Sequence, residues 1–472
     1  MKRSAVYAGV AALVCMSLLG GCASRRVSYK PPASPQLAQA EKWNTAEAGG
    51  AAAKPADDAT LARWWATLED PPLTSLEERA VKANLDLRKA ETRIRQARSN
   101  RESARADLLP TYTASGSAAG NRPSTRTMGQ LGQSYSAGLN ASWEPDFFKK
   151  LQGSVTAYER DIQAAEEDLR NTLVSLTAEV ALDYVDVRSY QAQLAVTRAN
   201  LAKYEDTYQM TVAKFESGLT TALDVQQALQ TVESTRAGIP SLETSIRKSS
   251  NAIAVLLDER PGAIDAELAE VKPVPSIPAE VAVGIPADLV RRRPDIREAE
   301  RQYAAQSARV GVAKANLYPS FTLSGAFNFG STNLPNLLTP AALASSLAGS
   351  VQQTFFNRRR LKEQVNLQNI ALEQYEISYE STVLSAIQDV EDALQAFAAE
   401  QVRRKSLAEA AKAAENAADM SRELYRTGLK DFLTVLDSER SVLSLQNSLA
   451  QSDATVTANL IRLYKAMGGG WN

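Results

Sequence analysis

The sequence predicts a mainly helical protein with four short amphipathic strands, built from one structural unit that occurs twice. The duplication is visible in 104–117 and 313–326, which are identical at seven of fourteen positions at a constant offset of 209. At an offset of 210 the matches continue to the segments around Gly218 and Gly428. Each copy has the pattern of a helix, two strands and a very long helix. A register held over more than a hundred residues indicates a duplicated structural unit.

The N-terminus is a processing segment. A basic start is followed by a largely apolar run, 5–19, and the run ends in Leu19-Gly20-Gly21-Cys22. This looks like a bacterial lipoprotein signal, so we expect 1–21 to be removed and Cys22 to be lipidated. The alternative is an ordinary secretory signal with an incidental cysteine. Ala23 and Ser24 follow Cys22 with no Asp among them, which by resemblance to enterobacterial sorting favours the outer membrane. We expect 22–73 to be an extended segment.

The composition excludes several classes of function. The net charge is −1, so the chain has no basic footprint for nucleic acid. The chain has no histidine, and its two cysteines, Cys15 and Cys22, both lie near the N-terminus. A Ser/His/Asp triad, a Cys/His pair and a zinc cluster are therefore excluded. We expect no catalytic residue, no metal site and no cofactor, although a carboxylate pair stays formally open. The scattered methionines give no signature of copper or silver export.

The first repeat, 74–270, opens with a helix over 74–107 that Pro110 ends. A hairpin, 111–143, follows, and within it 134–143 alternates with a period of two. The second repeat, 287–472, holds the matching hairpin, 320–356, in which 345–356 is the return strand. The apolar face is expected to carry Tyr135, Leu139, Trp143, Phe321, Leu323 and Phe327. The polar face is expected to carry Ser136, Asn140, Thr322 and Ser324. About ten residues with one apolar face match a tilted membrane strand, and a soluble hairpin is the alternative.

A long helix follows each hairpin. The segments 148–215 and 357–425 contain no proline and have apolar residues in steps of four and three, typical of a coiled coil. At 1.5 Å per residue, about 68 residues make a rod of roughly 100 Å. Gly218 and Gly428 are expected to end these rods.

Shorter helices then return along the rods, over 221–257 and 431–467, and the first contains Pro240. Proline removes a helical hydrogen bond, so we expect a bend there without a known role. A Pro-rich linker, 271–286, joins the two repeats.

Four strands cannot form a membrane structure alone. Bacterial barrels have at least eight strands, and an open sheet would leave edge amides unsatisfied in lipid. A homotrimer of duplicated units gives twelve strands with a wet, polar interior. The same closure would make the helices a hollow cylinder, so the sequence predicts a conduit.

Several motifs carry a family resemblance: Ala62-Arg-Trp-Trp-Ala66, Asp70-Pro-Pro-Leu73, Arg292-Arg-Pro-Asp-Ile-Arg-Glu-Ala-Glu300, Tyr425-Arg-Thr-Gly-Leu429 and Leu463-Tyr-Lys-Ala-Met-Gly-Gly-Gly-Trp471. They resemble the outer membrane factors, the TolC-like channels, and in particular the OprM/NodT-type efflux outer membrane lipoproteins. The resemblance implies a homotrimer in outer membrane lipid, with a twelve-stranded β-barrel and a long α-helical periplasmic barrel. It also implies a periplasmic adaptor (membrane fusion) protein and an inner-membrane pump of the resistance-nodulation-division class as partners.

In this family the channel closes at the helix tips, and the adaptor docks there. The resemblance implies docking at Gly218, Leu219, Gly428 and Leu429. The implied gate residues are Asp224, Tyr425, Arg426, Lys430 and Asp431. An acid usually follows the Gly-hydrophobic pair directly, but here Lys430 takes that place, so a carboxylate ring is left open. The bland alternative is that these charges are solvated groups at a helix end.

The function that follows is a passive exit duct for drugs or other small toxic compounds in a tripartite efflux system. The alternative is an outer membrane channel for type I protein secretion, which shares the fold. A periplasmic coiled-coil scaffold without a pore would not need matched amphipathic hairpins in both copies. A carboxylate-pair hydrolase has no marked residues.

Overall fold

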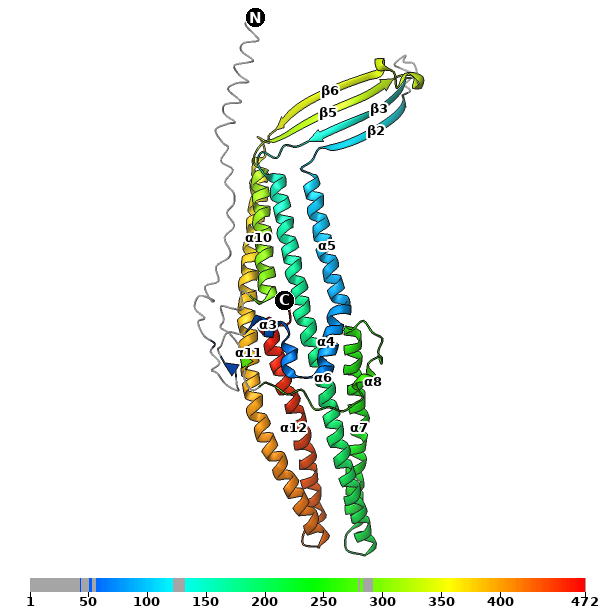
Figure 1. The fold of residues 1–472 in the computed structure, drawn as a ribbon, viewed down its shortest axis with the longest axis vertical. Helices are drawn as coiled ribbons and strands as arrows, with labels where there is room; N and C mark the ends of the chain where they lie inside the picture. Colours follow the sequence, from blue (N-terminus) through cyan, green and yellow to red (C-terminus); the bar gives the residue numbers. More distant parts are fainter. Residues whose placement is uncertain are drawn as a thin grey trace. The chain divides into compact units, whose positions relative to one another are not determined.

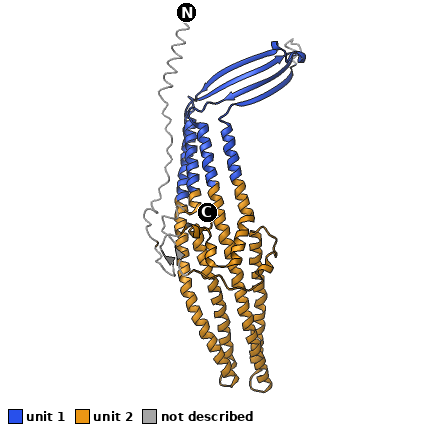
Figure 2. Ribbon diagram, in the orientation of Figure 1, with its two compact units in different colours: residues 1–33, 94–164, 299–379 blue, residues 34–93, 165–298, 380–472 orange. Residues whose placement is uncertain are grey.

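The computed structural model describes residues 43, 51–52, 57–121, 132–278, 281–282 and 292–471. The signal segment and Cys22 lie outside the described residues. The chain divides into two compact units (Figure 2). Among described residues, unit 1 comprises four strands, within 111–143 and 320–352, and the helical stretches 94–106, 150–164, 299–315 and 358–379. Unit 2 comprises the remaining helical parts, which both repeats supply, and two strands of two residues each, 51–52 and 281–282.

Unit 1 holds one four-stranded antiparallel sheet in the order β2-β3-β5-β6 (Figure 1). Its strands are β2 (Thr111–Asn121), β3 (Gly132–Trp143), β5 (Ser320–Ser331) and β6 (Leu343–Gln352). The hairpin of the first repeat therefore pairs with that of the second through β3 and β5. Two short 3-10 turns, η2 (Leu334–Asn336) and η3 (Pro340–Ala342), connect β5 to β6.

The predicted end of the return strand was wrong. β6 ends at Gln352 rather than at 356, because the chain leaves the ladder at Gln353. There the Gln353 side chain donates to the Leu317 carbonyl. The left-handed φ of 62° at Asn357 then turns the chain into the following helix.

Each repeat contains one very long helix, as the sequence predicted: α6 (Lys150–Glu216) has 67 residues and α11 (Arg358–Arg426) has 69. The other long helices are α5 (Leu85–Ala106), α7 (Ala222–Leu256), α10 (Pro294–Ala315) and α12 (Phe432–Ala466). None of the helices in the described part of the chain combines the length and apolar character that a membrane crossing requires.

The helix predicted over 74–107 is two helices, α4 (Pro71–Ala83) and α5, so the single-helix prediction was wrong. Asn84 separates them with an extended ψ of 133°. Its Oδ1 accepts from the amides of Asp86 and Leu87, which caps α5, while its Nδ2 donates to the Leu256 carbonyl. Asparagine caps helices in this way because its side chain replaces a missing backbone acceptor.

The end of the segment predicted to be extended is also helical, which corrects the expectation for 58–73. α3 (Asp58–Ala62) is capped by Asp57, whose Oδ2 accepts from the Thr60 amide. The 3-10 helix η1 (Trp64–Leu68) follows, because burial of Trp64 and Leu68 favours folding over extension.

The family motifs at the two ends of the chain pack together within unit 2. Trp64 is fully buried and stacks on Tyr464 with ring centroids 5.5 Å apart. The Gly470 amide donates to the Leu61 carbonyl at 2.9 Å. The guanidinium carbons of Arg170 and Arg297 lie about 5 Å from the Trp471 ring centroid, an arrangement that favours cation–π attraction.

The linker region contributes two short elements, α8 (Asp265–Leu268) and β4 (Val281–Ala282). β4 pairs in parallel with β1 (Ala51–Ala52). The helix α7 runs through Pro240 without interruption, so the bend expected there stays a prediction.

Candidate functional site

The pairing of the strands gives the sheet one apolar and one polar face. Residues opposite each other in an antiparallel ladder point to the same side. The register pairs Leu139 with Phe327 and with Ala114, and it pairs Asn140 with Thr113 and Ala326. One side therefore carries Tyr112, Tyr135, Leu139, Trp143, Phe321, Leu323, Phe327, Phe329, Leu347 and Val351. The other side carries Thr111, Thr113, Ser115, Ser117, Ser136, Asn140, Thr322, Ser324, Asn328 and Ser346.

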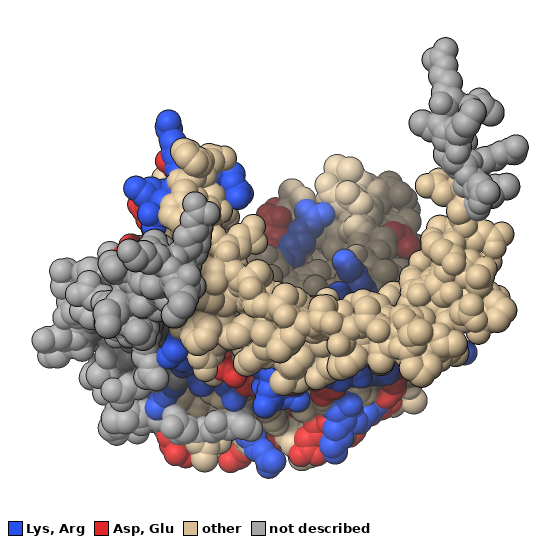
Figure 3. Space-filling view, turned by 90° about the horizontal axis from the view of Figure 1, so that it is seen from above, with Lys and Arg blue, Asp and Glu red and all other residues tan. Residues whose placement is uncertain are grey.

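These faces agree with the alternation predicted from the sequence. Leu139 and Phe327 are each 61% exposed, so the protomer leaves its apolar face uncovered. On the polar face the hydroxyl oxygens of Ser117 and Ser136 are 2.8 Å apart. None of the four strands contains Lys, Arg, Asp or Glu, and Figure 3 shows the sheet as a tan band.

Both long helices end in a left-handed glycine, Gly218 with φ 73° and Gly428 with φ 78°. The Leu219 amide donates to the Lys214 carbonyl and the Leu429 amide to the Leu424 carbonyl, each at 2.8 Å. This hydrogen-bond pattern is the Schellman motif, which satisfies the last carbonyls of a helix. It leaves the two leucines 75% and 72% exposed at the tips.

The helices that leave the tips are capped differently in the two copies. Thr221 caps α7, and Asp224 at its third position completes a capping box. At the matching positions, an offset of 210, Asp431 caps α12 and Thr434 stands third. The two residue types have exchanged places. Asp224 and Asp431 are therefore not equivalent, although the sequence predicted both as carboxylates of the gate at the tips.

Within the protomer these acids are held by local hydrogen bonds. Burial opposes the ionised form of Asp224, but hydrogen bonds from Thr220 and Thr221 hold its pKa below the ordinary value. Hydrogen bonds from the Thr434 hydroxyl and amide lower the pKa of Asp431. Both acids are thus ionised at neutral pH.

The other predicted gate residues do not form one cluster in the protomer. Arg426 pairs with Glu423 at 2.8 Å along its own helix. Tyr425 is buried against Phe432, and the Lys214 ammonium lies 4.2 Å from its ring centroid. Lys430 joins no ion pair within the described residues.

A buried polar cluster higher on the same helices was missed by the sequence reasoning. The Glu439 carboxylate accepts from the Thr207 hydroxyl at 2.7 Å and from Arg422 at 3.1 Å, and the Tyr204 hydroxyl donates to the Glu439 carbonyl. These contacts join α6 of the first copy to α11 and α12 of the second. Burial raises the pKa of Glu439. The only sequence signal was a lone acid on an apolar helix stripe, which is too weak to interpret.

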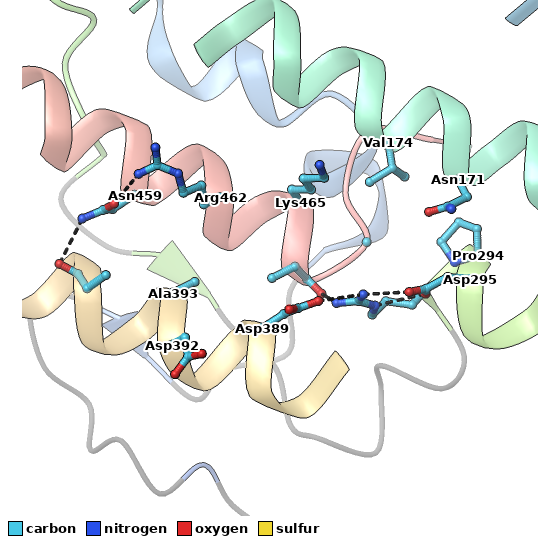
Figure 4. Close-up of a pocket in the computed structure, with 14 residues that line it drawn as sticks. Asn171, Val174, Pro294, Asp295, Asp389, Asp392, Ala393, Asn459, Arg462 and Lys465 are labelled. Carbon is cyan, nitrogen blue, oxygen red and sulfur yellow. Dashed lines mark hydrogen bonds and ion pairs between the residues drawn. The ribbon is translucent and has the colours of Figure 1, made fainter. Parts of the chain in front are cut away.

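A cavity of about 510 Å³ lies in unit 2 between α6, the start of α10, α11 and α12 (Figure 4). Arg293, from the Arg-Arg-Pro-Asp motif, pairs with Asp295 at 2.7 Å and with Asp389 at 3.0 Å, and it donates to the Ala466 carbonyl. The motif therefore holds the start of α10 against α11 and the C-terminal segment. The role of this motif is therefore structural. Three basic and three acidic side chains line the cavity, so its lining carries no net charge.

Further along α6, three acids lie close together. Burial, together with the neighbouring charges of Glu179 and Asp186, raises the pKa of Asp183 to about 6. Within the described ranges no group of three or more Cys, Asp or Glu residues could hold a metal ion.

Two helices of 67 and 69 residues, together with a two-faced sheet that carries no charged side chain, define a class of membrane channel. The chain belongs to the outer membrane efflux protein family, whose model matches residues 76–259 and 285–469. It is an outer membrane protein of the TolC-like fold, mainly helical with four antiparallel strands.

Particular relatives agree with this assignment. The chain is 33% identical to Nodulation protein T of Rhizobium leguminosarum bv. trifolii, over 96% of each chain. It is 30% identical to the probable efflux pump outer membrane protein TtgC of Pseudomonas putida, covering 100% of this chain and 96% of that protein. The solved structure of the outer-membrane channel OprN has a TM-score of 0.86 at 30% identity, over 94% of this chain and 98% of that one.

The comparisons confirm the family, the fold class and the outer membrane location predicted from the sequence. The relatives are named as channels and efflux proteins rather than as enzymes. The roles assigned to single residues stay predictions.

Proposed function

We propose that this protein is the passive exit duct of a tripartite efflux system for drugs or other small toxic compounds. The observation that carries the proposal is the four-stranded sheet with one exposed apolar face and one uncharged polar face. Such a sheet suits lipid on one side and water on the other. Two relatives from Pseudomonas putida are named as antibiotic and toluene efflux pump outer membrane proteins, which supports small compounds as the cargo.

Closure requires further copies of the chain. β2 and β6 stand at the two edges of the sheet, and neither has a second strand partner among the described residues. Exposed strand edges are not stable in lipid, because their amides lack partners. Three copies joined edge to edge make twelve strands, and with them a cylinder of helices that continues the duct.

The helix tips are the proposed docking site for a periplasmic adaptor protein. Gly218 and Gly428 turn the chain at the tip of each repeat, so that Leu219 and Leu429 project into solvent. Exposed apolar side chains at a repeated position suit a partner surface. An inner-membrane pump of the resistance-nodulation-division class would deliver the cargo. We also propose that the charged side chains at the tips, Asp224 and Asp431 among them, meet between neighbouring protomers and close the resting duct.

A lipid anchor at Cys22 is proposed for the mature N-terminus. A thioether-linked diacylglycerol and an amide-linked acyl chain contribute about 0.8 kcal/mol per buried CH₂. The intact mass of the purified protein tests this, and an unmodified N-terminus at another residue contradicts it. Cys22→Ser should lose the lipid and still trimerise.

Conductance and crosslinking test the function. The purified protein should form trimers with discrete conductance steps in planar bilayers. Leu429→Cys, carrying a photocrosslinker, should capture an adaptor at the tip, with Val402→Cys on the exposed side of the rod as the matched control. An adaptor that belongs to an ATP-driven exporter would support secretion instead. A protein that forms no conducting species would refute the duct.

A further inference from the structure

The two strand-to-helix junctions of unit 1 have the same backbone but different charge. Each passes through two phenylalanines and one residue with left-handed φ, 58° at Lys149 and 62° at Asn357. At an offset of 208 the first junction, 144–150, matches 352–358. Figure 1 shows the second junction where β6 meets the start of α11.

The first junction is neutralised by its own acids. Glu144 pairs with the Lys150 ammonium at 2.7 Å, and the Asp146 carboxylate accepts from the Gln152 amide at 2.7 Å. Phe148 stacks on Tyr318 with ring centroids 4.8 Å apart. Charges and rings are therefore mostly satisfied within the protomer.

The second junction has lost both acids and gained arginines. Gln352 and Thr354 stand where the first copy has Glu144 and Asp146. The first turn of α11 is Arg358-Arg359-Arg360, with no acid in it. All three arginines are exposed, and within the described residues none of them joins an ion pair.

This arrangement is unfavourable for the protomer alone. A helix N-terminus carries a partial positive charge, so three cations in the first turn destabilise it. Phe355 and Phe356 precede the arginines and are 78% and 92% exposed, without a ring partner in the described part of the chain. An anion at the helix start together with an apolar layer beside the rings would relieve both costs.

We propose that Phe355, Phe356 and the three arginines form a binding site for an anionic phospholipid of the periplasmic leaflet. The site lies where the uncharged strands end, which is the depth of the headgroups if the strands span the membrane. The rings lie at the acyl boundary, as aromatic side chains do at membrane interfaces, and the arginines contact the phosphate. This inference rests on the membrane placement of the strands in the proposed function.

The test counts lipids bound to the purified full-length protein by native mass spectrometry, during titration with phosphatidylglycerol or phosphatidylcholine. The parent protein should prefer phosphatidylglycerol. Arg358→Gln with Arg359→Gln should weaken that binding about thirtyfold, since each basic residue near an anionic headgroup contributes about fivefold. The matched control, Lys149→Gln with Lys150→Gln, removes the same charge from the first junction and should change it less than threefold.

Equal losses in both double variants, or none in either, would overturn the site. Unchanged lipid binding with a trimer that dissociates would mean that the arginines contact a neighbouring copy, which also overturns it. If the double variant does not fold, Arg359→Gln alone should weaken binding about fivefold, and unchanged affinity would refute the site. Conductance in phosphatidylcholine bilayers tests the duct separately. A protein that conducts without binding phosphatidylglycerol therefore refutes only the lipid site.

Discussion

Exchanging a single side chain between the two faces of the sheet tests the duct most directly. Leu139→Arg places a charge on the apolar face, opposite Phe327, and Asn140→Arg places the same charge on the polar face, one residue further along. Both positions belong to β3, so the two variants share strand, depth and added charge. They differ only in the face that receives the arginine.

The position of Leu139 in β3 sets the magnitude. Trp143, the last residue of the strand, lies four positions further on, which is about 13 Å along the strand at 3.3 Å per residue. At a tilt near 40° this is about 10 Å of depth, close to the middle of an apolar band about 25 Å tall. An arginine at mid-membrane costs roughly 2–4 kcal/mol, so three copies lose roughly 6–12 kcal/mol per trimer.

The assay measures heat-labile trimer in the outer membrane fraction for the parent and both variants. Leu139→Arg should nearly abolish the trimer, and Asn140→Arg should leave it near the parent level. As an independent measurement, a hydrophilic thiol reagent should label Asn140→Cys and not Leu139→Cys in intact membranes. Equal trimer yields, or labelling in the opposite phase, would refute the assignment of the faces and with it the duct.

The remaining predictions concern the helices. Asp224→Asn with Asp431→Asn keeps both caps but removes the tip carboxylates, so single-channel conductance should rise, while Glu409→Gln on the rod should not change it. Conductance equal to the parent's would place the gate elsewhere. Gly428→Ala meets no atom within 4 Å, so its cost is the left-handed backbone alone, about 1–2 kcal/mol in urea unfolding. An unchanged urea midpoint would contradict a cost of placing alanine in this left-handed backbone. Because the pKa of Asp183 rises from 3.8 to about 6 on folding, stability should fall as pH increases from 4 to 6. Asp183→Asn should flatten that dependence in thermal unfolding, and an identical slope would exclude this group as its cause.

The spacing of apolar residues predicted those helices and strands that have one clearly apolar face. The two-residue alternation gave the faces of β3 and β5, and the glycines gave the ends of both long helices. The break at Asn84 was not predictable, because its cause is a side chain that caps α5 while contacting the distant Leu256. Local propensity favoured one helix, and a tertiary contact decided otherwise.

The site was less predictable than the fold. Alignment of the two repeats identified the helix tips. It could not show that Asp431 is the N-cap of α12, whereas Asp224 is the third residue of α7. The Glu439 cluster depends on which helix of the second copy lies against α6, and no short-range pattern contains that information. The sequence singled out the motif that contains Arg293, but the contact of Arg293 with Asp389 could not be predicted because it depends on the tertiary structure.

The exchange of threonine and aspartate between the two tip caps affects the symmetry that a partner meets. In backbone terms the two tips are alike, since each ends in the same glycine motif with a projecting leucine. In charge they differ, since the second tip presents Lys430 and Asp431 where the first presents Thr220 and Thr221. A partner that binds by shape finds six equal places around a trimer. A partner that binds by charge finds three, alternating with three of another kind.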